Sequence, residues 1–272
     1  MKRTISFTFF LLFAQLSIIN CQLSIANAQN LYIGSFYVTS TTEESLYGDG
    51  GDKWANRMPI ICDMFNFEQP DVLGLQSLTE AQLGQLSKRL TNFNAAENIL
   101  YNKTTLELDT CGIVEEMPEG STCSWARLQK AGKAFYIFNI CFATDANVAL
   151  SSSTRVRNAM SEINTENLPS FVVGFLGVNE SKTAYSRLAP RHYDCFKQAS
   201  TVSAEYGTVN NFDLAANHGT ERYDFVFAPR SGVTIKAYGQ LQYGYFTKES
   251  DGSYKRRLPS THFPVMAKVT LP

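Results

Sequence analysis

The chain has 272 residues, with 24 Lys and Arg against 25 Asp and Glu, and a formal net charge of −1. No linker rich in Pro, Gly or Ser divides it, so its length suits one α/β domain or two small ones. A protein whose affinity comes from neutralising many phosphates normally has a surplus of cations. The composition therefore gives no strong signal for a nucleic-acid partner.

Residues 1–28 have the features of a secretory signal peptide. Two cations precede an apolar stretch from Phe7 to Ala14, and Ala26-Asn27-Ala28 forms a cleavage site of the A-x-A type. The apolar stretch is too short to cross about 30 Å of hydrocarbon. We expect cleavage after Ala28, export to the periplasm, cell surface or medium, and a mature single domain of residues 29–272 without a transmembrane segment. Cleavage leaves 22 cations against 25 anions, a net charge near −3.

Five cysteines remain after this cleavage, at positions 62, 111, 123, 141 and 195. Their odd number leaves at least one thiol free or paired with another molecule. Cys111 and Cys123 flank a predicted hairpin turn at Glu119-Gly120, so they are the pair best placed for a disulfide. Whether they pair stays open. Cys62 lies on the apolar face of a predicted helix and is expected to be a small buried hydrophobic residue.

The first half of the chain predicts a strand, a helix and a second, buried strand. Tyr32 to Thr39 is rich in aromatic and β-branched residues, which favour a strand. Residues 40–53 form a polar loop, and apolar residues from Trp54 to Phe65 then recur at helical spacing. The stretch from Pro70 to Leu78 reads PDVLGLQSL, whose short apolar run predicts a buried strand in which Gly74 allows a close backbone approach.

The rest of the chain alternates between the two kinds of element. We expect a helix capped by Thr79, strands at Ile99–Tyr101 and Thr105–Leu108, hairpin strands at Thr122–Gln129 and Ala134–Cys141, a helix at Thr154–Asn167, a strand at Leu168–Val173, a helix at Ser181–Ser200 broken at Pro190, a strand at Arg222–Phe227 with Val233–Leu241 paired beside it, and a long loop at Gln242–Leu258.

Several of these segments resemble the motifs of the endonuclease/exonuclease/phosphatase superfamily. PDVLGLQSL resembles its PD-(I/V)-(L/V)-(G/A)-LQE strand, and Trp54 with Arg57 matches the W-x-x-R of the preceding helix. TCSWARLQ, RYDFVF and PSTHFPV resemble TWARL, R-I-D-Y-I-F and PSDHFPV, in the order of the family. The resemblance covers nearly the whole mature chain. It implies a deoxyribonuclease-I-like α/β fold, a four-layer α/β/β/α sandwich of two packed mixed β-sheets flanked by helices.

The resemblance also implies that most of the family's catalytic positions are changed. Members of the family use divalent cations to hydrolyse phosphoesters, and carboxylates hold these hard ions. The changed positions carry Tyr37, Ser77, Cys141, Phe175, Gly177 and Thr261 where the family has Asn, Glu, His, Asp, Asn and Asp. Asp224 and His262 are kept, and in the family they form a hydrogen-bonded pair. They are the candidate residual catalytic pair, or they survive as a buried hydrogen bond.

Three functions fit this pattern. The first is an exported binding or structural pseudoenzyme without a metal cofactor, whose ligand is a small phosphoester or a cell-surface molecule. The second is an active phosphodiesterase or other hydrolase that holds Mg²⁺ or Mn²⁺ with relocated ligands such as Asp145, Glu180 or Asp213. The third is a surface interaction protein whose 242–258 loop, with its aromatic and basic residues, makes the contacts.

Overall fold

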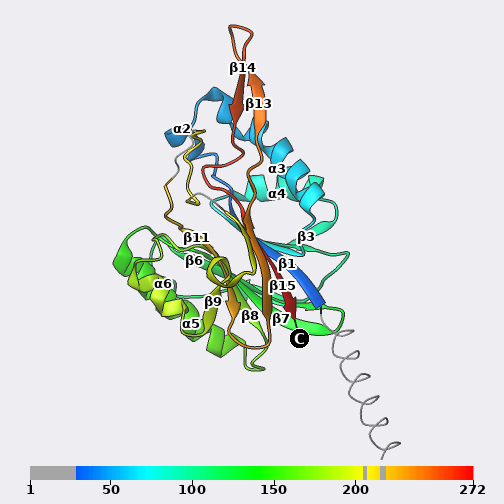
Figure 1. The fold of residues 1–272 in the computed structure, drawn as a ribbon, viewed down its shortest axis with the longest axis vertical. Coiled ribbons are helices and arrows are strands. Elements are labelled where there is room, and N and C mark those ends of the chain that lie inside the picture. Colours follow the sequence, from blue (N-terminus) through cyan, green and yellow to red (C-terminus); the bar gives the residue numbers. More distant parts are fainter. Residues whose placement is uncertain (1–28, 205–206, 215–218, 272) are drawn as a thin grey trace, which may run out of the picture.

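Two β-sheets pack face to face between two layers of helices in the computed structural model, which describes residues 29–204, 207–214 and 219–271 (Figure 1). The seven-stranded sheet has the order β10 (Thr201–Ser203), β12 (Thr234–Gln240), β15 (Val265–Leu271), β1 (Gln29–Tyr37), β2 (Val72–Gln76), β4 (Ile99–Asn102) and β3 (Phe93–Ala96). The six-stranded sheet has the order β5 (Glu107–Ile113), β6 (Thr122–Lys130), β7 (Lys133–Cys141), β8 (Ser170–Phe175), β11 (Asp224–Pro229) and β9 (His192–Asp194). Both sheets are mixed, as expected from the sequence.

Helices cover the outer face of each sheet. The seven-stranded sheet carries α3 (Trp54–Glu68) and α4 (Glu80–Arg89), and the six-stranded sheet carries α5 (Ala146–Ile163) and α6 (Thr183–Leu188) (Figure 1). Short helices lie in the connections: α2 (Glu44–Tyr47), the 3₁₀-helix η1 (Gly50–Asp52) and α7 (Cys195–Gln198). Within the described ranges, no helix combines the length and the apolar character that a membrane span requires.

The strand predicted from PDVLGLQSL is β2, and all five of its residues are buried. Val72 contributes to the core between the sheets, whereas Leu73 and Leu75 face α3 and α4. A Cβ at Gly74 would lie 2.5 Å from Oδ1 of Asn139, which belongs to the other sheet. Glycine is therefore required there, because the two sheets approach each other closely at this point.

The predicted hairpin is also present, with β6 and β7 paired antiparallel from Thr122 opposite Cys141 to Lys130 opposite Lys133. The possible disulfide is not formed. Cys111 lies opposite Ala126 rather than Cys123, and all five cysteines of the described chain are free thiols. Cys62 is buried on α3, as expected.

Three segments differ from the prediction. Residues 181–200 contain two short helices and the strand β9 instead of one interrupted helix, because Asp194 caps α7 and β9 completes the edge of the six-stranded sheet beside β11. Val233–Leu241 does not pair beside the strand that contains Asp224. It forms β12, which pairs with β15 in the other sheet. The predicted loop 242–258 contains a two-stranded arm, β13 (Tyr245–Lys248) and β14 (Tyr254–Arg257), that projects from the body (Figure 1).

Smaller differences concern a helix boundary and two short edge strands that were not predicted, β3 and β10. Helix α5 begins at Ala146 instead of Thr154, because the carboxylate of Asp145 accepts hydrogen bonds from the first free backbone N–H groups of the helix. The edge strand β3 was not predicted, since Phe93–Ala96 has no alternating apolar pattern.

Arg57 of α3 joins the loops around the cavity described below. Its side chain is fully buried, and all five of its N–H groups donate a hydrogen bond. The acceptors are the backbone carbonyls of Val38, Thr39, Asp52 and Pro259 and the carboxylate of Glu44, at 2.7 to 3.1 Å. The guanidinium therefore connects the end of β1, the turn before α3 and the loop before β15.

Replacing Arg57 by Met should destabilise the protein by about 3–5 kcal/mol, because Glu44 and four buried carbonyls would lose their donor. Denaturant unfolding followed by circular dichroism measures this change. The matched control is Arg89→Met on the exposed face of α4, which should change the free energy of unfolding by less than about 0.5 kcal/mol. Equal small effects for both variants would contradict the assigned role of Arg57.

Candidate functional site

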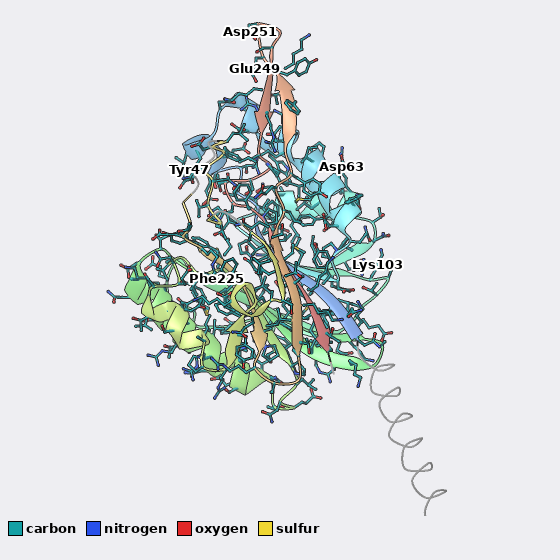
Figure 2. The ribbon with its side chains drawn as sticks, viewed as in Figure 1. Tyr47, Asp63, Lys103, Phe225, Glu249 and Asp251 are labelled. Carbon is teal, nitrogen blue, oxygen red and sulfur yellow. The ribbon has the colours of Figure 1, made fainter. Side chains whose placement is uncertain are left out.

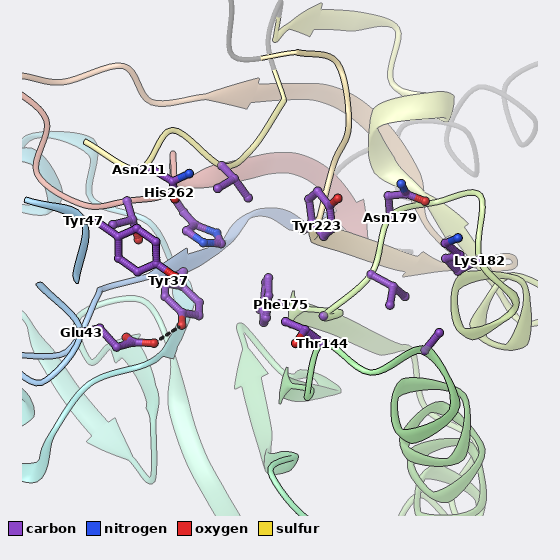
Figure 3. Close-up of a pocket in the computed structure, with 15 residues that line it drawn as sticks. Tyr37, Glu43, Tyr47, Thr144, Phe175, Asn179, Lys182, Asn211, Tyr223 and His262 are labelled. Carbon is purple, nitrogen blue, oxygen red and sulfur yellow. Dashed lines mark hydrogen bonds between the residues drawn. The ribbon is translucent and has the colours of Figure 1, made fainter. Parts of the chain in front are cut away.

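A cavity of about 590 Å³ opens where β1 and β8 end and where the loop before β15 passes. Five of the eight positions identified from the sequence line it: Tyr37, Phe175, Gly177, Thr261 and His262 (Figure 3). The carboxyl ends of β1 and β8 meet at this edge, and β11 begins there because it runs antiparallel to β8. The topology thus gathers residues that are far apart in the sequence.

Asp224 and His262 form the hydrogen bond that the resemblance implies. Nδ1 of His262 lies 2.8 Å from Oδ2 of Asp224, and Asp224 is only 1% exposed. Because a carboxylate only accepts, Nδ1 carries the proton in this contact. The other carboxylate oxygen of Asp224 is buried without a hydrogen-bond partner among the described residues. His262 is therefore the main compensation for this buried carboxylate, while its catalytic role stays a prediction.

Two aromatic rings pack against the imidazole of His262. The Tyr37 ring stacks on it with centroids 4.1 Å apart and planes 16° apart. The Phe175 ring meets it edge-on at 5.4 Å and also contacts the Tyr37 ring at 5.1 Å. Both aromatic residues stand where the resembling family has a polar ligand. The imidazole of His262 is thus covered by aromatic rings on two sides.

Glu43 brings a carboxylate to the end of β2. It accepts hydrogen bonds from the hydroxyl of Tyr37 at 2.7 Å, from the hydroxyl of Ser77, and from the backbone N–H and the hydroxyl of Ser40 at 3.2 Å each. Burial raises the pKa of Glu43, but these hydrogen bonds together lower it by more, so the net shift of the pKa is downward. Glu43 is therefore an ionised carboxylate whose oxygens are already engaged.

Glu43 is not among the site residues predicted from the sequence. Its signal is weak: it follows Ser40 by three residues, the spacing of a capping box, in the loop that was expected beside the site. Other unpredicted residues that line the cavity supply rings, amides and one cation: Tyr47, Tyr223, Asn179, Asn211 and Lys182 (Figure 3). They come from connecting segments that have no periodic pattern.

Ser77 and Cys141 line a second cavity of about 420 Å³, together with Asn139. The amide of Asn139 is buried and bridges the sheets, donating to the carbonyl of Leu75 at 2.9 Å and accepting from the side chain of Gln76 at 2.7 Å. Burial raises the pKa of the Cys141 thiol to about 12, so this thiol is neutral at physiological pH. The chain of contacts from Tyr37 through Glu43 to Ser77 runs between residues of the two cavities.

Gly177 ends the turn after β8 with a φ of 75°. A Cβ there would lie 2.2 Å from the carbonyl oxygen of Ala143. The backbone of this turn therefore excludes any side chain at position 177, including the amide found at the matching position of the resembling family.

The donors around the cavity do not fit a hard divalent cation. Mg²⁺ and Mn²⁺ prefer carboxylate and other oxygen ligands in octahedral geometry. The oxygens of Glu43 are taken by hydroxyl and N–H donors, and Asp224 lies behind His262. Among the described residues, no three His, Cys, Asp or Glu side chains are grouped so that they could hold a metal ion.

Replacing His262 by Ala should lower the free energy of unfolding by about 1–3 kcal/mol, since the carboxylate of Asp224 would lose its hydrogen bond to the imidazole. Thermal or denaturant unfolding measures the loss. His262→Asn is the matched control, because its amide N–H can still donate toward Asp224, and it should recover part of the stability. An Ala variant as stable as the parent would show that the pair does not hold this part of the structure together.

No protein-family model matches the sequence, and no curated protein sequence matches it. Solved structures do. An endonuclease/exonuclease/phosphatase family protein from Bacteroides thetaiotaomicron has a TM-score of 0.81 and 22% identity over 90% of this chain and 99% of its own. A mannosyl-6-phosphatase from the same organism has a TM-score of 0.79 and 23% identity over 88% and 99%. A D. rerio TDP2 complexed with single-strand DNA product has a TM-score of 0.66 and 16% identity over 89% and 99%. The chain therefore has the deoxyribonuclease-I-like fold of the endonuclease/exonuclease/phosphatase superfamily.

Proposed function

We propose that the protein is an exported binding protein, a pseudoenzyme that keeps the superfamily's cavity without metal-dependent phosphoesterase activity. One observation carries the proposal: the rings of Tyr37 and Phe175 pack on His262 at the positions where the resembling family has polar ligands. Phosphoester hydrolysis in this family depends on a cation that supplies several kcal/mol of charge stabilisation in the transition state. An apolar wall beside the imidazole offers no site for that cation.

The character of the cavity supports a binding role. Its volume lies within the range of about 300–1,000 Å³ that is typical of small-molecule sites. The rings of Tyr47 and Tyr223 offer flat apolar surfaces, and Asn179, Asn211 and Lys182 offer hydrogen bonds and one positive charge. Such a lining suits a small ligand that has both an apolar face and an anionic or polar group. A small phosphoester or a cell-surface molecule of this kind is the proposed ligand.

A second candidate is an active hydrolase, and Glu43 is the observation that favours it. This carboxylate touches Ser77, the residue at the position of the family's metal-binding Glu. A structural neighbour is a mannosyl-6-phosphatase. The relocated ligands suggested by the sequence do not support this candidate, since none of them lines either cavity. Asp145 caps α5, Glu180 pairs with Arg222 at 3.3 Å, and the side chain of Asp213 is exposed.

Export after cleavage at Ala28 remains part of the proposal. Residues 1–28 lie outside the described residues, so the structure does not bear on it. Mass spectrometry of the secreted protein should find Gln29 as the first residue. A secreted chain that still contains residues 1–28 would overturn this part.

The activity test compares hydrolysis with and without Mg²⁺ or Mn²⁺. Substrates are a chromogenic phosphodiester, a phosphorylated mannose, a sphingomyelin-like lipid and DNA. We expect turnover equal to the buffer control in every case, because a positioned acid/base pair contributes only about 10²–10⁴ in rate and each 1.36 kcal/mol lost costs about tenfold. Calorimetric titration with either metal should show no binding at millimolar concentration.

A matched pair of variants decides between the two candidates. Metal-dependent turnover that disappears in both Glu43→Gln and His262→Ala would establish the active hydrolase and overturn the pseudoenzyme proposal. Turnover that neither variant changes would be assigned to a contaminating enzyme. In that case the pseudoenzyme proposal would stand.

A further inference from the structure

The β13–β14 arm has two faces of different character. Its strands pair antiparallel, with Phe246 opposite Arg256 and Lys248 opposite Tyr254. Since side chains alternate between the faces of a sheet, these four residues share one face, which we call the outer face of the arm. Phe246 and Tyr254 are 66% and 68% exposed, and both cations are exposed too.

The inner face fixes the arm to the body. Arg257 is buried and pairs with Asp52 and Glu249 at 2.9 Å and with Asp49 at 2.5 Å. Lys255 pairs with Asp49 at 2.8 Å, and this bond lowers the pKa of Asp49 to about 2. The arm therefore projects as an anchored element. The charges on its inner face are neutralised within the protein.

The cations of the outer face are not neutralised in the same way. In the part of the chain that the structure describes, no ion pair is formed by Lys248 or Arg256. Each of them stands directly across the ladder from an exposed aromatic ring. The outer face is thus positively charged, and it presents two rings, each beside a cation. Its charge favours an anionic ligand, and its rings favour one with flat apolar faces.

The size of the outer face limits what can bind. Each strand has four residues, so the face is about 13 Å long, with strands about 4.8 Å apart. A stable protein–protein interface buries about 800 Å² on each partner, which is much more than this face offers. A thin linear polymer needs no larger surface, because it can continue past the arm on both sides.

Two other anionic partners fit less well. Aromatic and basic residues also anchor proteins at membrane surfaces. However, the exposed carboxylate of Asp251 lies at the end of the arm, where it would meet an anionic membrane first (Figure 2). Single-stranded nucleic acid also binds to rings and cations, but much of its affinity comes from neutralising many phosphates, whereas a sugar polymer can bind mainly by stacking its rings on the two aromatic side chains.

We propose that the outer face of the arm binds a linear acidic polysaccharide. The rings of Phe246 and Tyr254 stack on the C–H faces of sugar rings, and Arg256 and Lys248 pair with the carboxylates or sulfates of the polymer. Arg256 can hold a carboxylate with two parallel hydrogen bonds. This inference does not depend on the proposed function of the cavity, which involves none of these residues.

The test measures binding of the purified full chain to polygalacturonate by affinity electrophoresis and calorimetry, with the fully methyl-esterified polymer as the neutral probe. The double variant Phe246→Ala/Arg256→Gln should bind the acidic polymer about tenfold more weakly. The matched control, Phe67→Ala/Lys103→Gln, removes an exposed ring and an exposed cation elsewhere and should change the affinity less than about twofold. Raising the salt concentration from about 0.05 to about 0.5 M should weaken binding further.

Several results would overturn the inference. These are no binding to the acidic polymer, equal binding to the neutral one, or an equal loss in both double variants. Tighter binding to phosphatidylglycerol vesicles or to a thymidine oligonucleotide would also do so, by assigning the outer face to a membrane or to nucleic acid. Because all four substituted residues are exposed, unchanged circular dichroism should accompany each variant.

Discussion

The buried guanidinium of Arg57 is the constraint on which the site depends. A buried cation is tolerated only when its donors are satisfied, so each of its five hydrogen bonds holds a piece of backbone in place. These pieces lead directly to the cavity: Tyr37 precedes Val38, Glu43 precedes Glu44, and His262 follows Pro259 by three residues. One side chain in a helix therefore sets the mutual position of an aromatic ring at the end of β1, a carboxylate at the start of α2 and an imidazole in the segment before β15.

Around this scaffold the aromatic rings of the site pack where the resembling family has polar ligands. Phe175 lies opposite Asp224 in the pairing of β8 with β11, so the substituted ring and the retained carboxylate occupy neighbouring positions of one ladder. The ring excludes water from the Asp224–His262 contact, which strengthens that hydrogen bond and makes either partner costly to remove alone. A site of this kind is stable because its parts pack against each other, and it presents a shaped surface to a ligand.

Much of the fold follows from local pattern. β2 and the β6–β7 hairpin have strong signals, namely a short apolar run and paired aromatic strands, and both are present. The failures have physical reasons. β12 was assigned to the wrong sheet because its actual partner, β15, lies further along the chain, and local sequence pattern does not reveal such a pairing. The β13–β14 arm is held by Arg257 and the carboxylates of Asp49, Asp52 and Glu249 instead of by an apolar face, so periodicity does not mark it.

The site, like the fold, was predicted in part: some of its residues could be found from the sequence and others could not. Motif order located Tyr37, Phe175, Thr261 and His262, which line one cavity, but it did not separate them from Ser77 and Cys141, which line another. Glu43 and Lys182 were missed because they reach the cavities through connections whose path only the folded chain defines.

The turn at Gly177 limits how this site can change through single substitutions. A Cβ at this position would collide with the carbonyl of Ala143, so the turn accepts only glycine as it stands. An amide at position 177 would require the turn and the segment after β7 to move together, and each change alone would be destabilising. Single substitutions can vary the rings and amides that line the cavity, whereas a polar side chain at position 177 lies across a fitness valley. The turn therefore directs the evolution of this site toward changes in the cavity lining.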